Sequence, residues 1–217
     1  MRRALVGGLL IMAACSTSSE PPPTTQVPGA ATAEAAARTW LLALASGDYD
    51  GLSTIVSSGS LALAVGAENG LAMADILAIA NDERPGEVAG YWQSVAASLT
   101  DDGFAPSVLA VQEGLELGVE GYAAVDLAVP GGLLATTVVV RDGADGWRVD
   151  WGATVGPGLV RPLRSMLDGL DYTAEADQVR QLFIAAGPGL RAGLEARPDL
   201  PSEFVSDVED LLRLLGA

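Results

Sequence analysis

The chain has 217 residues, and its 28 acidic side chains against 12 basic ones give a formal net charge of −16. A surface this acidic repels the phosphates of nucleic acid, so we expect no nucleic-acid partner. All of the basic side chains are arginine, because the sequence contains neither lysine nor histidine. This composition excludes histidine acid–base chemistry, lysine Schiff bases and metal sites that need histidine. With 49% hydrophobic residues, the chain can bury a substantial core.

The first residues carry the pattern of an export signal. Met1-Arg2-Arg3 is a short positive segment, and Ala4–Met12 is a brief apolar run. This run is too short to cross a bilayer as a stable helix, which needs about 20 apolar residues. We therefore expect residues 1–14 to be a signal peptide that is removed on export.

The segment Met12-Ala13-Ala14-Cys15 resembles the lipobox of bacterial lipoproteins. It departs from the usual pattern at Met12, where leucine is commoner, although methionine is also apolar and unbranched at Cβ. In that family the cysteine sulfur is diacylglycerated and the freed amine is usually acylated, with chains such as palmitate. Cys15 is the only cysteine of the chain, so it has no partner for an intramolecular disulfide. The alternative is an ordinary signal peptide, with Cys15 left unmodified.

Lipidation of Cys15 would place the protein at the cell membrane, on its extracytoplasmic face. Two or three acyl chains give stable anchoring, since each buried methylene contributes about 0.8 kcal/mol. Residues 15–29 comprise the lipidated cysteine and a linker rich in Ser, Thr and Pro. Its prolines favour extended structure, so the linker is expected to act as a spacer between lipid and folded domain. The acidic surface repels anionic head groups, so the lipid has to provide the membrane attachment.

Helix-forming residues dominate from Ala30 onward. Apolar residues recur at helical spacing between residues 37 and 44, where Thr32 can cap the start of the helix and Gly47 can end it. Further helices are expected over residues 52–56 and, as a pair interrupted at Arg84-Pro85-Gly86, over residues 71–99.

The pattern changes at Phe104 to short runs rich in Val, Leu and aromatic residues, separated by turn clusters. Such spacing predicts an antiparallel meander, and the alternation within the runs predicts that each strand buries one face against the preceding helices. The predicted fold class is therefore α+β, with helices on one face of a curved antiparallel sheet of about four strands. The expected strands cover residues 108–117, 122–129, 134–141 and 147–155.

Beyond Pro162 the pattern is again helical. A short helix is expected over residues 163–170. Thr173 can cap a second helix, which should break at Gly187-Pro188-Gly189. Ser202 can cap a third, whose apolar residues repeat at three and four positions. These residues predict a C-terminal helical extension.

Two segments resemble a known family. The helix AEAAARTWLLALASGDYDGL, and the strand Gly146–Trp151 with the turn Pro157-Gly158-Leu159, are similar to the cone-shaped fold of nuclear transport factor 2 relatives. More narrowly, they resemble the N-terminal non-catalytic domain of some penicillin-binding transpeptidases. The resemblance covers residues 30–162, which leaves residues 163–217 as the extension. It implies a non-catalytic module near the membrane, since the catalytic serine of that family lies in a later domain.

No residue of the chain is assigned a catalytic or metal-binding role, and no cofactor is expected. Turn chemistry explains the aspartates in the Gly-Asp breaks, and no segment has the order of ligands that a calcium loop needs. In the wider superfamily the cone encloses a cavity that some members use for small molecules or catalysis. If this cone is open, Trp92, Tyr122 and Trp151 are candidates to line a ligand pocket. If it is closed, they are core residues.

These observations predict an exported, lipid-anchored cell-envelope protein that acts as a non-enzymatic binding or adaptor module. Its partner would be another envelope protein or a small apolar ligand. Two alternatives remain: a carrier of a lipid-like ligand, and a carboxylate-dependent isomerase or dehydratase. A continuous apolar tunnel would favour the carrier, and a deep pocket with a buried, unpaired carboxylate would favour the enzyme. A cone filled with aromatic side chains would favour the adaptor.

Overall fold

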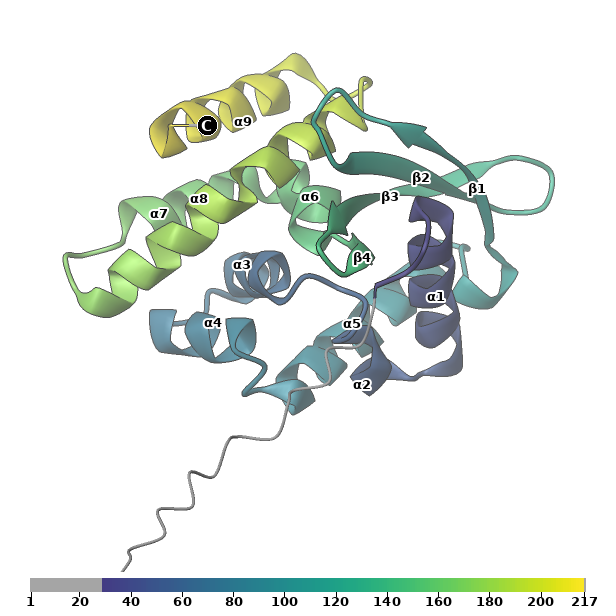
Figure 1. Ribbon diagram of the computed structural model, residues 1–217, viewed down its shortest axis with the longest axis horizontal. Coiled ribbons are helices and arrows are strands. Elements are labelled where there is room, and N and C mark those ends of the chain that lie inside the picture. Colours follow the sequence, from purple (N-terminus) through teal and green to yellow (C-terminus); the bar gives the residue numbers. More distant parts are fainter. Residues whose placement is uncertain (1–28, 217) are drawn as a thin grey trace, which may run out of the picture.

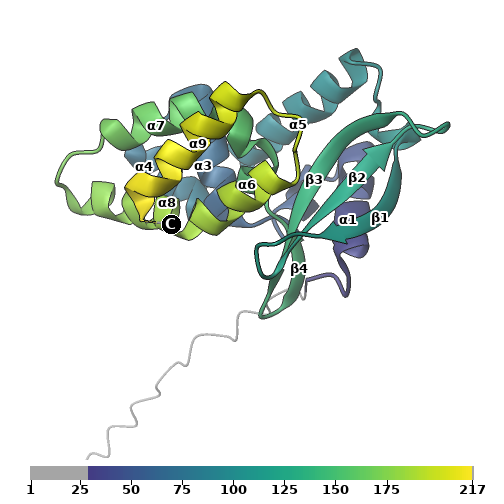
Figure 2. The same ribbon diagram turned by 90° about the horizontal axis from the view of Figure 1, so that it is seen from above.

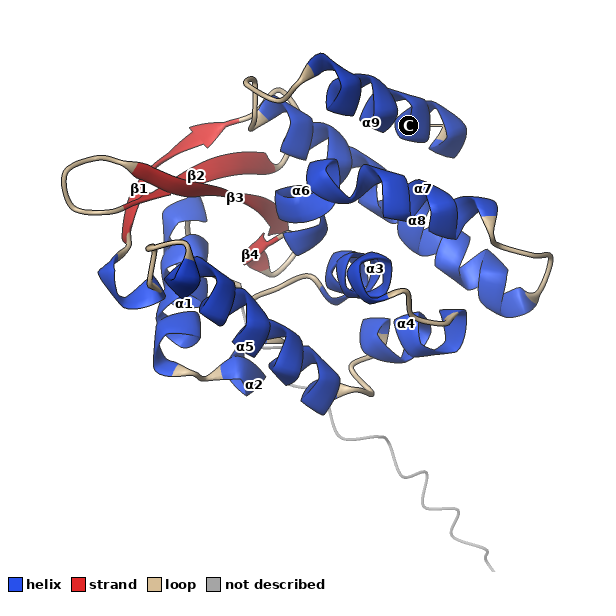
Figure 3. Cartoon of the chain, turned by 180° about the vertical axis from the view of Figure 1, so that it is seen from behind, coloured by secondary structure: helices blue, strands red, loops and turns tan. Residues whose placement is uncertain are grey.

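The computed structural model describes residues 29–216. The expected signal peptide (residues 1–14), Cys15 and the linker as far as Pro28 lie outside the described residues. The described residues form one sheet of four strands at one side of the molecule, together with the helices that pack against it (Figure 1). The helices of the C-terminal third extend away from the sheet on the opposite side (Figure 3). The α+β class, the antiparallel sheet and the C-terminal helices that the sequence predicted are thereby confirmed.

The first helices follow the predicted capping chemistry. Helix α1 (Ala33–Ser46) begins after Thr32, whose hydroxyl accepts a hydrogen bond from a first-turn amide at 3.1 Å. It ends at Gly47, which has a left-handed φ of 73°. The helix expected over residues 52–56 is wrong: α2 (Tyr49–Leu52) starts after Asp48, whose carboxylate accepts a hydrogen bond from a backbone amide, and ends where the prediction begins. Residues 53–55 form a turn, and Val56 pairs with Val149 in a bridge.

Helix α3 (Ser58–Asn69) was not predicted. All of its residues from 60 to 66 are buried, so the segment has no polar face over most of its length and shows no helical alternation of polar and apolar residues. It runs through the middle of the molecule and contacts four other helices. The helices α4 (Met73–Ala80) and α5 (Pro85–Asp101) are the pair that was predicted between residues 71 and 99.

The sheet is an antiparallel meander, in the order β1-β2-β3-β4. A short 3-10 helix (Pro106–Val108) precedes it. The strands twist strongly relative to one another (Figure 2). Their bounds are β1 (Ala110–Glu116), β2 (Tyr122–Ala128), β3 (Leu134–Gly143) and β4 (Gly146–Val149).

The prediction of a strand over residues 147–155 is wrong beyond Val149. The Asp150 carboxylate accepts a hydrogen bond from the Ala153 amide at 3.0 Å, which starts helix α6 (Trp151–Val155). A 3-10 helix (Gly156–Leu159) follows directly. The alternation of Trp147, Val149 and Trp151 therefore combines two strand residues with the first residue of a helix.

The expectation that helices cover only one face of the sheet is also wrong. Helix α1 packs on the face that carries Val125 and Val138. On the opposite face, Val139 packs with Ala153 of α6 and Ala192 of the long C-terminal helix. Figure 2 shows α1 and the C-terminal helices on different sides of the strands. Strands β2 and β3 are consequently buried on both faces at this end of the sheet.

The C-terminal helices pack onto the earlier ones as part of one hydrophobic core, which extends from Ala33 to Leu212. The break expected at Gly187-Pro188-Gly189 is absent, because one helix continues through all three residues. Ser202 is the first residue of the last helix and makes no capping hydrogen bond, which corrects its predicted role. The helices are α7 (Val160–Asp168), α8 (Ala174–Glu195), which Thr173 caps as predicted, and α9 (Ser202–Leu215).

Candidate functional site

Three tryptophans fill the space between α1, α5 and the sheet. The ring centroids of Trp92 and Trp151 lie 4.9 Å apart in an edge-to-face arrangement, and those of Trp40 and Trp151 lie 5.6 Å apart. Trp40 and Trp92 are buried almost completely, with 1% and 0% of their surface exposed. The region that a cone-shaped fold would leave hollow is therefore occupied by indole rings.

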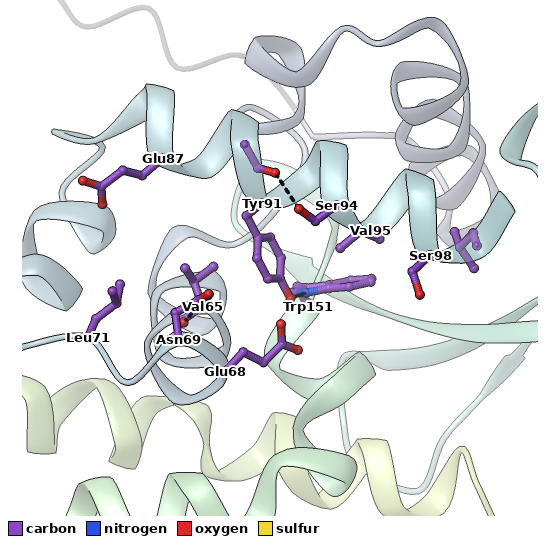
Figure 4. A pocket seen from close by; sticks show the side chains of 12 residues that line it. Val65, Glu68, Asn69, Leu71, Glu87, Tyr91, Ser94, Val95, Ser98 and Trp151 are labelled. Carbon is purple, nitrogen blue, oxygen red and sulfur yellow. Dashed lines mark hydrogen bonds between the residues drawn. The ribbon is translucent and has the colours of Figure 1, made fainter. Parts of the chain in front are cut away.

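A cavity of about 670 Å³ opens beside this cluster, between α3 and α5 (Figure 4). Its floor consists of the buried side chains of Val65, Tyr91 and Trp151. Its rim is polar and exposed. The rim residues are Glu68, Asn69, Glu87, Ser94 and Ser98, and the remaining lining residues are Leu71, Gly90, Val95 and Leu99.

A hydrogen bond fixes the two aromatic rings of the floor. The Nε1 of Trp151 donates to the Oη of Tyr91 at 2.8 Å. Trp151 is held there because Asp150 starts α6 directly after β4. Burial raises the pKa of the Tyr91 hydroxyl, so this group stays protonated at neutral pH. Since its oxygen accepts from Trp151, its own hydrogen is free to be donated to a further acceptor.

The nearest carboxyl on α3 is that of Glu68, near the end of the helix, which Figure 4 shows pointing toward Tyr91 and Trp151. Desolvation by the surrounding protein raises the pKa of Glu68, and the nearby Tyr91 hydroxyl opposes this rise. Glu68 makes no ion pair with any residue of the described part of the chain. It is thus a partly desolvated carboxyl without a positive neighbour.

The second carboxylate of the lining has a different environment. Glu87 forms an ion pair with Arg84, which also reaches Asp75 at 2.6 Å. These three side chains are partly exposed, so each pair contributes little to stability. The pairing nevertheless leaves Glu68 as the lining carboxylate whose charge no arginine offsets.

The three aromatic residues that the sequence suggested for a pocket lie in different places. Trp151 lines the cavity, whereas Trp92 is part of the tryptophan cluster behind it. Tyr122 begins β2 and lies on the face of the sheet that α6 and α8 cover. Its hydroxyl is 3.5 Å from the Asp150 carboxylate, and the Arg141 guanidinium lies 6.0 Å from the centre of its ring. Tyr122 does not line this cavity.

Asp150 is the most deeply buried carboxyl of the described residues. Burial raises its pKa, while the hydrogen bond from the Ala153 amide acts in the opposite direction. Asp150 does not line the cavity beside Trp151. Because it caps a helix and has hydrogen-bond partners, it is not the buried, unpaired carboxylate in a deep pocket that would favour an enzyme.

Sequence reasoning missed Glu68 because it did not identify α3, on which Glu68 lies. The one local signal was Gly70, which has a left-handed φ of 62° and ends the helix two residues after Glu68. Within residues 29–216 no group of three or more acidic or cysteine side chains lies close enough together to hold a metal ion.

Comparison of the chain with protein-family models, with curated proteins and with solved structures found no match. None of the helices in the described part of the chain combines the length and the apolar character that crossing a membrane requires. The functional proposal therefore rests on two features, the N-terminal motif and the cavity beside Trp151.

Proposed function

We propose that the protein is an exported lipoprotein, anchored through acylated Cys15 at the extracytoplasmic face of the cell membrane, whose folded part binds a small ligand without transforming it. The observation that carries the binding role is the cavity of about 670 Å³ beside Trp151. Its size falls in the range of about 300–1,000 Å³ that is usual for small-molecule sites. Its apolar floor and polar rim are also typical of such sites.

The composition of the lining supports binding rather than catalysis. It offers carboxyl, hydroxyl, amide and aromatic groups, and its one carboxylate free of an arginine is Glu68. Trp151 also belongs to the tryptophan cluster, so the floor of the site is rigid and needs little reorganisation to accept a ligand.

The proposal includes a relationship to the cone-shaped nuclear transport factor 2 fold. In its favour, α1 packs along one face of a twisted antiparallel sheet and the strand that carries Trp147 closes it. The tryptophan cluster fills the space that would be the interior of the cone. The binding site would therefore be the cavity outside it, between α3 and α5. An envelope protein that docks over this cavity would be the adaptor form of the same function.

Replacing Cys15 by serine tests the anchor. A carbonate wash releases proteins that are bound only peripherally. The wild-type protein should remain with the membrane vesicles, because its acyl chains stay inserted in the lipid. Cys15→Ser should be released into the supernatant. Ser16→Ala, one residue further along, serves as the control and should stay bound. Sedimentation of Cys15→Ser with the washed vesicles would overturn the anchor.

Filling the cavity tests the binding role. Ser94 and Gln93 are neighbours on α5 and both are exposed, but only Ser94 lines the cavity. Ser94→Trp should abolish binding of a co-purifying small molecule, whereas Gln93→Trp should retain it. Native mass spectrometry of the full chain released from its own membranes would show the ligand as added mass. Retention of that mass by Ser94→Trp, or its absence from the wild type, would contradict the proposal.

A further inference from the structure

We propose that the cavity beside Trp151 selects small organic ammonium ions, that is, cations that carry an apolar body, with Glu68 as the counter-charge. This inference rests on the binding function proposed above and specifies the class of ligand. Two independent properties of the lining point to it, the sign of its charge and the nature of its floor, and the partial desolvation of Glu68 agrees with them.

The charge of the lining favours a cation. Its only ionisable side chains apart from Tyr91 are Glu68 and Glu87, and no basic residue of the described chain lines it. Arg84 offsets the charge of Glu87 from outside the cavity. The uncompensated negative charge is therefore localised at Glu68, directly beside the aromatic floor. An anionic ligand would meet repulsion there, and a neutral one would leave the carboxylate unpaired.

The floor favours a cation with apolar substituents. The Nε1 of Trp151 is satisfied by the Oη of Tyr91, so the indole needs no polar ligand group to pair with it. What the floor offers is aromatic surface together with Val65, and aromatic rings attract alkylammonium groups. Magnesium and calcium need several oxygen ligands, whereas one carboxylate over an apolar floor suits an ammonium ion that sheds little hydration.

Partial desolvation of Glu68, which lies on the exposed rim of the cavity, adds to the preference for a cation. Desolvation raises the pKa of its carboxyl, which means that the empty cavity disfavours the charged form. A cation that occupies the cavity replaces the lost water with an opposite charge and favours that form again. Binding of a cation should therefore lower the pKa of Glu68, against the rise that desolvation causes.

A pair of probes of equal shape separates charge from shape. Acetylcholine carries a trimethylammonium group, and 3,3-dimethylbutyl acetate replaces its nitrogen by carbon and is neutral. Titration calorimetry would use the full chain in nanodiscs of dioleoyl phosphatidylglycerol, a lipid without an ammonium head group. The wild type should bind acetylcholine about tenfold more tightly than the neutral probe. Ser94→Trp should bind neither.

Two charge-removing variants localise the effect. Glu68→Gln should lose the preference for acetylcholine and keep its affinity for the neutral probe. Glu83→Gln is the matched control, since Glu83 is exposed, precedes α5 and does not line the cavity. It should behave as the wild type. An equal loss in both variants would mean that acetylcholine responds only to the net charge of −16, and would overturn the proposal.

The remaining outcomes distinguish this inference from the binding function on which it rests. Equal affinity of the wild type for both probes, with loss in Ser94→Trp, would overturn selectivity for cations and leave the cavity as a binding site. Failure of both probes to bind, together with a co-purifying mass that Ser94→Trp abolishes, would also overturn the ammonium class alone. Failure of both probes and of the co-purifying mass would overturn both.

Discussion

Asp150 is the residue on which the junction between the sheet and the C-terminal helices depends. It follows β4 directly, and its carboxyl caps α6 through the Ala153 amide at 3.0 Å. The Tyr122 hydroxyl lies 3.5 Å from its other oxygen. The side chain is fully buried, so its hydrogen bonds have to compensate for the loss of water around it.

Burial of Asp150 should make stability depend on pH in a defined direction. Because its pKa is raised, the folded protein keeps a proton that the unfolded chain loses above about pH 3.9. The resulting stabilisation is complete below that pH and is lost as the pH rises through the folded value. Asparagine does not titrate and can still cap α6. The free energy of unfolding of the wild type minus that of Asp150→Asn should therefore fall as the pH rises, as measured by urea denaturation.

Asp171 provides a control of opposite sign. Hydrogen bonds from the Thr173 side chain and backbone lower the pKa of this exposed carboxyl. Its stabilisation is therefore present above the unfolded pKa and is lost as the pH falls through the folded value. The free energy of unfolding of the wild type minus that of Asp171→Asn should rise with pH over the acidic range. If the free energy difference between the wild type and Asp150→Asn also rose with pH, the Asp150 carboxyl would be better stabilised as an anion than its burial implies.

Single residues could be predicted from sequence where their role is local. Thr32 and Gly47 delimit α1 because a hydroxyl N-cap and a left-handed C-cap act within one turn of the chain. The roles of Glu68 and Asp150 depend on partners far along the sequence. Glu68 meets Tyr91 on another helix, and no local pattern indicates such a contact. The aromatic content named Trp92, Tyr122 and Trp151 as candidates for a pocket, of which only Trp151 lines the cavity, and it did not indicate the carboxyl beside it.

At the scale of elements, the close contact of α6 with α8 depends on two glycines one turn apart. A Cβ atom on Gly193 would overlap the backbone carbonyl oxygen of Ala153, and one on Gly189 would lie 2.9 Å from the Asp150 carboxylate. Helix α8 therefore approaches α6 through glycine backbone. Helices α6 and α8 together cover the second face of the sheet, where Val139 of β3 packs with Ala153 of α6 and Ala192 of α8.

Gly193→Ala should force α8 away from α6 and lower the free energy of unfolding by about 2–3 kcal/mol, because the methyl group would meet backbone that cannot turn aside. Gly86→Ala is the control. Gly86 lies in the first turn of α5 with open space around it, so alanine should be neutral or stabilise by up to about 1 kcal/mol. Urea denaturation of the three proteins measures the difference. Equal stability of Gly193→Ala and the wild type would contradict this account of the helix contact.

The same contact explains why α8 does not break where its sequence predicts. Pro188 is exposed, so the carbonyl of Ile184 that loses its helical hydrogen bond lies on the solvent side, where water can replace it. Gly187 and Gly189 are buried toward the core. Local propensity favours a break at these three residues, and packing against α6 outweighs it. Tertiary packing also explains why α3 was not predicted. Its burial on all sides removes the alternation of polar and apolar residues by which a helix is recognised in a sequence.

At the scale of the molecule, the acidic side chains outnumber the basic ones that could offset them, 28 against 12. The formal net charge is −16. In the described part of the chain, several arginines pair with carboxylates within four residues on the same helix, such as Arg164 with Asp168 and Arg213 with Asp210. Such exposed pairs contribute about 0–1 kcal/mol each. Repulsion between the remaining carboxylates should therefore dominate the surface electrostatics of the folded protein.

Salt should consequently stabilise this protein. Raising sodium chloride from about 20 to about 300 mM shortens the screening length from about 20 Å to about 6 Å, which weakens long-range repulsion more than close ion pairs. The melting temperature should rise by several degrees. Asp101→Asn/Asp102→Asn removes two exposed charges at the C-terminal end of α5, where the helix dipole also disfavours them. This variant should melt higher than the wild type at low salt and gain less from added salt. A melting temperature that falls with salt would show that the ion pairs outweigh the repulsion.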